Sequence, residues 1–232
     1  MPNTSQYELP LFPLNVVLYP GMQFPIRVFE DRYKLMVKKC LESDQSFGVV
    51  LIKSGKEVGG SAVPYDVGTV AKITGVVPEE EGCMTLSVCG ERVFRILKIQ
   101  RITPYMIAKV SVFSPAVDSN EKLLNLSSRV SQHFRTYISL LASLKGVDVP
   151  KFELDDDPQR LSYMVASGMV VSEQKKQGLL EASSLEDRLQ EEMRLLKTEN
   201  LSLELFLSQK KNTKAPDGAR GRGIGDQRFS PN

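Results

Sequence analysis

The sequence predicts an α+β protein in which a compact β-barrel or β-sandwich is followed by a bundle of helices. As far as Ser114, short runs of apolar residues, several alternating with polar residues, are separated by Gly and Pro, which is typical of strands joined by tight turns. After Pro115 the apolar residues recur every three or four positions, which indicates amphipathic helices. The last of these stripes runs from Leu185 to Leu207 with heptad-like spacing, so we expect one long helix near the end of the chain.

The change of spacing near Pro115 also predicts the domain boundaries. We expect a β-rich part over residues 1–116 and a helical part over residues 117–209. Residues 210–232 are polar, rich in Gly and Pro and without periodicity, so we predict a disordered tail. This tail contains six Lys or Arg and two Asp, a net charge of +4, which leaves −2 for the rest of a chain whose net charge is +2.

The β part opens with the proline-rich stretch over residues 9–25. Each proline fixes its own φ angle and favours an extended residue before it, so this stretch cannot be a helix. We expect an extended strand, then a type II turn with Pro20 at its second position and Gly21 at its third, then a strand from Gln23 to Phe29.

The rest of the β part is predicted to contain one helix and several strands. Residues 29–41 place their apolar side chains on one helical face, with acidic residues at the start and lysines near the end. Polar turns are expected at Pro78–Gly82 and at Gly90–Glu91. The expected strands are residues 47–53, 68–73, 83–88, 92–96 and 106–112.

Four helices are predicted in the second half. The first runs from an N-cap at Asn120 to a stop at Gly146, and the second begins with Asp157 as N-cap and Pro158 in the first helical position. The third begins at Ser172, and a capping box over Ser183–Glu186 starts the last. Gly168 is expected in the middle of the second helix, where it either weakens the helix by about 1 kcal/mol or allows a close packing contact.

Several motifs, in the same order along the chain, resemble the Lon protease amino-terminal domain, also called the Lon substrate-binding domain. The resemblance covers about residues 7–200. The motifs that carry it are Leu9-Pro10-Leu11-Phe12-Pro13-Leu14, Tyr19-Pro20-Gly21-Met22, Gly68-Thr69-Val70-Ala71, Gly90-x-Arg92-x-Phe94-Arg95-Ile96, Asp157-Pro158 through Ser167, Gln177-Gly178-Leu179-Leu180-Glu181 and Arg188-Leu189.

This resemblance implies a PUA-like β pseudo-barrel followed by a helical subdomain. Full-length Lon enzymes continue into an ATPase with a phosphate loop and then a Ser-Lys protease domain. This sequence contains neither motif, so it resembles a stand-alone form of the substrate-binding domain. We therefore predict a protein that is not an enzyme, although annotation carried over from the family would name an ATP-dependent peptidase.

The residues themselves contain no marked catalytic or metal-binding constellation. Cys40, Cys83 and Cys89 form neither a disulfide framework nor a CxxC pair, and His133 is the single histidine. We expect no cofactor, no metal and reduced thiols in a cytoplasmic protein. A signal peptide and a membrane-spanning run are not recognisable, so we expect no membrane partner.

The expected function is non-catalytic binding of unfolded or partner polypeptides, linked to proteolysis through a protease or chaperone partner. The alternative is an RNA-binding module, since PUA-like barrels are used in that way elsewhere; the net acidic body argues against nucleic acid. A monomer is favoured, because three shorter helices precede the last one and need a partner. A dimer through the last helix, with Asn200 setting its register, is the alternative.

The candidate client-binding residues are Tyr19, Met22 and Phe24. They place two aromatic rings and a flexible thioether around the rigid Pro20–Gly21 turn, and such side chains suit promiscuous apolar contacts. The alternative is that Tyr19 and Phe24 close the barrel. The groove between the β and α parts is then the next place to look.

Overall fold

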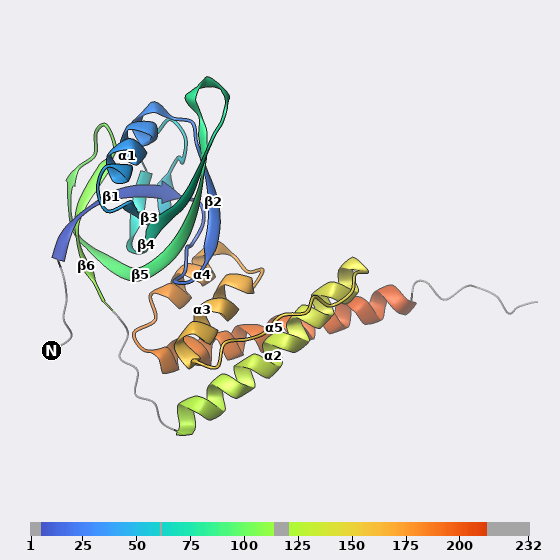
Figure 1. The fold of residues 1–232 in the computed structure, drawn as a ribbon. Helices are drawn as coiled ribbons and strands as arrows, with labels where there is room; N and C mark the ends of the chain where they lie inside the picture. Colours follow the sequence, from blue (N-terminus) through green and yellow to red (C-terminus); the bar gives the residue numbers. More distant parts are fainter. Residues whose placement is uncertain (1–5, 61, 114–120, 213–232) are drawn as a thin grey trace, which may run out of the picture.

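The computed structural model describes residues 6–60, 62–113 and 121–212 and shows a β-barrel beside an extended helical part (Figure 1). The strands are β1 (Gln6–Leu14), β2 (Gln23–Val28), β3 (Ser46–Gly55), β4 (Ala62–Pro78), β5 (Met84–Arg101) and β6 (Met106–Val112). The helices are α1 (Asp31–Leu41), α2 (Glu121–Lys145), α3 (Pro158–Gly168), α4 (Glu173–Leu180) and α5 (Leu185–Asn212), and a short 3-10 turn, η1, spans Glu80–Gly82.

The six strands form one closed sheet. Their order is β2-β5-β4-β3-β1-β6, and a further pairing of β5 with β6 closes the barrel. The pairing of β1 with β3 is parallel and the other pairings are antiparallel. The length of β5 makes closure possible, because its first half pairs with β2 and its second half with β6. The barrel, rather than the sandwich, is therefore the architecture of the β part.

The expected turn around Pro20 is present. The Met22 N–H donates to the Tyr19 carbonyl oxygen at 3.0 Å, and Gly21 has a φ of +81°. These are the hydrogen bond and the positive φ at the third position that a type II turn requires.

The predicted turn at Gly90–Glu91 is wrong, because β5 runs through both residues without a break. Gly90 is instead the point where the Tyr19–Met22 turn crosses the strand. The Gly21 N–H donates to the Gly90 carbonyl oxygen at 2.8 Å, and the Gly90 N–H donates to the Met22 carbonyl oxygen at 2.9 Å. A Cβ atom on Gly90 would lie 2.1 Å from the Tyr19 carbonyl oxygen. Glycine is therefore needed here because two backbone segments come very close, and not because the chain reverses.

In the helical part, α2 and α5 lie side by side and run in the same direction (Figure 1). Near their starts Lys122 pairs with Glu186 at 2.6 Å, and further along Asn200 Nδ2 donates to the His133 carbonyl oxygen at 3.0 Å. The predicted stripe of α5 is buried within its own chain from Leu185 to Asn200. Beyond that point Leu201, Leu205 and Phe206 are exposed.

The structure contains the predicted cap of α3 and the predicted stop after α2. Asp157 caps α3 by accepting a hydrogen bond from the Arg160 N–H at 2.8 Å, and Gly146 has a φ of +68° directly after α2. The capping box of α5 is shifted by one residue from the prediction. Its N-cap is Ser184, whose Oγ accepts from the Asp187 N–H at 3.0 Å.

Gly168 is the last residue of α3 rather than a mid-helix residue. A Cβ atom there would lie 2.7 Å from Cζ of Phe134, so the close-packing alternative holds. The predicted cap at Asn120, the boundary at 116/117 and residues 213–232 of the predicted tail lie outside the described residues. The predicted end of the helical part at residue 209 is three residues short, because α5 continues to Asn212.

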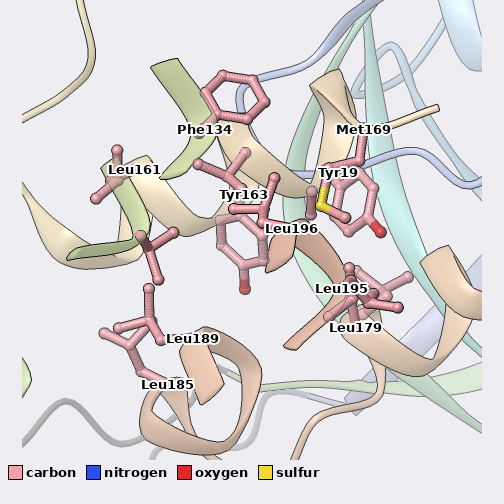
Figure 2. Packing of buried hydrophobic residues seen from close by; sticks show 14 of the residues in the cluster. Tyr19, Phe134, Leu161, Tyr163, Met169, Leu179, Leu185, Leu189, Leu195 and Leu196 are labelled. Atoms are coloured by element: carbon pink, nitrogen blue, oxygen red, sulfur yellow. The ribbon is translucent and has the colours of Figure 1, made fainter. Parts of the chain in front are cut away.

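Helix α4 connects the barrel to the helical part. The Tyr19 hydroxyl donates to the Lys176 carbonyl oxygen at 2.7 Å, and Gln177 Nε2 donates to the Val67 carbonyl oxygen at 3.0 Å. The shared apolar cluster contains residues from the barrel side, such as Val67, and residues of α2 to α5. Figure 2 shows Tyr19 of the barrel side near Met169 and Leu179 of the helical part. The two parts therefore pack through one common core, which fixes the surfaces between them.

Candidate functional site

A groove lies where the Pro20–Met22 turn of the barrel faces α3. Its volume is about 540 Å³. We call it the turn–α3 groove. It is lined by Pro20, Gly21, Met22, Glu91, Asp155, Asp157, Gln159, Arg160, Tyr163, Met164 and Ser167.

Both walls of the groove are held by local structure already described. On the barrel side, the hydrogen bonds between the turn and Gly90 fix the position of Met22 and of the neighbouring Glu91. On the helix side, the Asp157 cap and Pro158 fix where α3 begins, which sets the positions of Tyr163 and Met164 one to two turns later. The groove is therefore formed by ordered elements on both sides.

The apolar lining comes from Met22, Tyr163 and Met164. Met22 is half-buried and packs against the shared core, and Met164 is 39% exposed. The ring of Tyr163 is nearly buried, and its centroid lies 6.2 Å from that of Tyr19 beneath it. Two thioethers and a ring edge form an adaptable apolar surface of the kind used at promiscuous contacts.

Most charged groups lining the groove are acidic. Glu91 projects from β5, and Asp155 and Asp157 lie at the start of α3. The one lining cation, Arg160, is engaged with the aspartates, since its Nε lies 3.1 Å from Asp155 Oδ2 and 3.9 Å from Asp157 Oδ1. The groove thus combines an apolar centre with an acidic rim.

The structure separates the three residues predicted as a client-binding site. Only Met22 lines the groove. The expectation that Tyr19 presents its ring to a client is wrong, because Tyr19 is fully buried and its hydroxyl is bonded to α4. Burial raises the pKa of this hydroxyl well above its usual range. Phe24 is half-buried, packs against the barrel cluster and does not line the groove.

Sequence reasoning missed the contribution of β5 and α3 to this site. Glu91 and the residues of α3 lie about 70 and 140 positions from the turn along the chain, and no local pattern joins them.

A buried polar cluster lies behind Tyr163. The Arg188 guanidinium carbon is 4.0 Å from the centroid of the Tyr163 ring, and Arg188 Nε donates to Ser162 Oγ at 2.7 Å. The same hydroxyl donates to Glu192 Oε1 at 2.6 Å. Arg188, Ser162 and Glu192 are all fully buried. Within the described part of the chain, Arg188 Nη1 and Nη2 and Glu192 Oε2 have no hydrogen-bond partner.

Burial raises the pKa of Glu192 to about 8, and the Ser162 hydrogen bond and the Arg188 charge lower it by less. The folded protein therefore holds this proton more tightly than the unfolded chain does. The resulting stability is fully present below the ordinary pKa of about 4.5 and is lost as the pH rises toward 8.

We expect the Glu192→Gln variant to flatten this pH dependence. Between pH 5 and pH 8, the free energy of unfolding of the unmodified chain should fall by about 2 kcal/mol or more relative to the variant. Urea denaturation in matched buffers measures both curves. Two parallel curves would mean that Glu192 titrates alike in the folded and unfolded states.

Neither Cys40 nor His133 lines the turn–α3 groove. Burial raises the pKa of the Cys40 thiol to about 11, which opposes formation of a nucleophilic thiolate. His133 is half-buried on α2. Within residues 6–60, 62–113 and 121–212, no cluster of His, Cys, Asp or Glu could hold a metal ion, and no helix is long and apolar enough to cross a membrane.

The barrel, the helical part docked on it and the groove between them define a two-part α+β module with a PUA-like pseudo-barrel, as the resemblance implied. The family model of the ATP-dependent protease La (LON) substrate-binding domain matches residues 8–198. The chain therefore belongs to the Lon substrate-binding domain family.

Similar proteins include full-length proteases and isolated domains. The chain is 28% identical over 200 residues to Lon protease 2 of Myxococcus xanthus, covering 85% of this chain and 24% of that protein. It is also 28% identical over 200 residues to Lon protease of Escherichia coli (strain K12), covering 84% of this chain and 25% of that protein. The chain thus spans about a quarter of the length of these relatives and matches their substrate-binding domain.

Two solved structures resemble the fold. The Lon N-terminal domain protein from Xanthomonas campestris superposes with a TM-score of 0.60 at 28% identity, covering 79% of this chain and 95% of that one. The N-terminal domain of the Mycobacterium avium complex Lon protease gives a TM-score of 0.63 at 17% identity, covering 84% of this chain and 98% of that one, which is a likeness of fold alone.

Proposed function

We propose that this chain binds exposed apolar segments of unfolded polypeptides in the turn–α3 groove, does not cleave them, and passes them to a protease or chaperone partner in the cytoplasm. The observation that carries the proposal is the groove itself, an apolar centre with a polar rim. A non-catalytic binding protein gains affinity from such a surface. The family's substrate-binding domain supports the same role.

The chemistry of the groove favours a polypeptide over RNA. The rim carries Glu91, Asp155 and Asp157, whose charges repel phosphates. Tyr163 is the aromatic residue in the lining, and its ring is nearly buried against Tyr19 and Arg188, so it offers little face for a base to stack on. Flexible methionine side chains suit segments of varied sequence.

The test replaces both methionines of the groove. In the Met22→Ser/Met164→Ser variant, each lost anchor should remove about 1–2 kcal/mol of binding energy, so the affinity should fall tenfold or more. Fluorescence anisotropy with labelled, reduced and carbamidomethylated α-lactalbumin as an unfolded client measures the Kd. Thermal melts confirm that the variant is folded, and gel analysis checks that the client stays intact.

A matched control changes two apolar residues that are similarly exposed but lie elsewhere. Leu35 and Leu41 on α1 are 40% and 39% exposed and line a different surface, beside Val76 of β4. The Leu35→Ser/Leu41→Ser variant should bind the client with unchanged affinity. Equal losses in both double variants, or no loss in the folded methionine variant, would exclude the groove as the client-binding site.

A further inference from the structure

The charges around the turn–α3 groove come from both of its walls. Glu91 belongs to the barrel wall, and Asp155, Asp157 and Arg160 belong to the helix wall. Three carboxylates and one guanidinium leave a net charge of −2 around the apolar residues that line the groove. A segment that places an apolar side chain between Met22 and Met164 therefore has carboxylates on either side of it.

These carboxylates are not equally available. Asp155 is engaged by Arg160 at 3.1 Å, and its side chain is 27% exposed. Asp157 lies farther from Arg160, at 3.9 Å, and its side chain is 44% exposed. Glu91 is exposed and forms no ion pair with any residue that the structure describes. Glu91 on the barrel wall therefore lacks a counter-charge, and Asp157 on the helix wall is the more exposed of the two aspartates that share Arg160.

We infer that the groove selects client segments in which Lys or Arg lies next to the apolar anchor residue, with Glu91 and Asp157 as the groups that recognise the cation. This inference rests on the proposed function and names the class of client within it. An exposed ion pair contributes little by itself, but two carboxylates facing one bound segment add their effects. Acidic segments meet repulsion from the same groups, which widens the difference between the two classes.

The experiment uses the full chain and three fluorescein-labelled peptides of fifteen residues. The peptides share the same four Leu and Phe positions and carry three Arg, three Gln or three Glu between them. The Arg peptide should bind about tenfold more tightly than the Glu peptide, with the Gln peptide between them. Raising NaCl from 50 to 500 mM should reduce this ratio, because salt screens exposed charges.

Two substitutions locate the effect. Glu91→Gln removes the charge on the barrel wall. Asp157→Asn removes the charge at α3 and keeps a residue that caps helices well. The double variant should bind the three peptides with nearly equal affinity. Glu42→Gln, an exposed carboxylate next to α1, is the control and should leave the preference unchanged.

The outcomes separate this inference from the proposed function. Equal binding of the three peptides by the unmodified chain, or a preference that survives in the double charge variant, overturns the charge selection. In that case, loss of binding in Met22→Ser/Met164→Ser still supports capture in the groove. If that methionine variant binds all three peptides normally, the groove is not the client site and both proposals fail.

Discussion

Replacing Arg188 with Ala is expected to lower the free energy of unfolding by about 3 to 5 kcal/mol. Arg188 is the largest of the fully buried side chains, so its truncation leaves a cavity between α3 and α5. It also removes the donor to Ser162 Oγ and the cation stacked on Tyr163. Urea denaturation at pH 7, followed by far-UV circular dichroism, measures the change.

Two further variants show which cause dominates. Arg188→Met keeps most of the side-chain volume without the charge, so it should retain much of the lost stability if the cavity is the main cause. Arg194→Ala removes an exposed arginine that pairs with Glu191 three residues away on the same helix, and its effect should stay below about 1 kcal/mol. A loss below 1 kcal/mol in Arg188→Ala would show that the buried cluster contributes little to the core.

Replacing Gly90 with Ala is expected to lower the free energy of unfolding by about 3 kcal/mol and to weaken client binding as well. The added Cβ atom would lie 2.1 Å from the Tyr19 carbonyl oxygen, which is backbone and cannot rotate away as a side chain can. Relief of this clash must move the Tyr19–Met22 turn away from β5, which also moves Met22 out of the groove. Thermal and urea denaturation measure the first effect, and client anisotropy measures the second.

Gly75 provides the matched control, because it is also a strand glycine of the barrel. A Cβ atom on Gly75 would have its nearest neighbour at 3.6 Å, an ordinary contact. Gly75→Ala should therefore change the stability by no more than about 0.5 kcal/mol and leave client binding unchanged. Equal behaviour of the two alanine variants would mean that the close approach at Gly90 does not position the turn.

The sequence by itself determined the elements and their class, because these depend on local chemistry. Prolines excluded a helix from the opening stretch, Pro20–Gly21 marked the turn, and Asp157–Pro158 marked the start of α3. Apolar periodicity separated strands from helices and predicted the long α5, whose stripe is buried as far as Asn200. Each of these signals lies within a few residues of the structure that it specifies.

Only the tertiary structure decided the role of Gly90, which aromatic side chains are exposed to a client, and where the groove lies. The sequence suggested a turn at Gly90 because a glycine is required both where a chain reverses and where another backbone segment comes very close. At Gly90 the second reason applies, since the Tyr19 backbone packs against it. The position of Tyr19 beside a turn suggested an exposed ring. In the structure α4, which lies more than 150 residues later in the chain, covers Tyr19 and accepts a hydrogen bond from its hydroxyl. The groove joins Met22, Glu91 and Tyr163, whose proximity depends on the packing of the barrel against the helical part rather than on any local preference of the backbone.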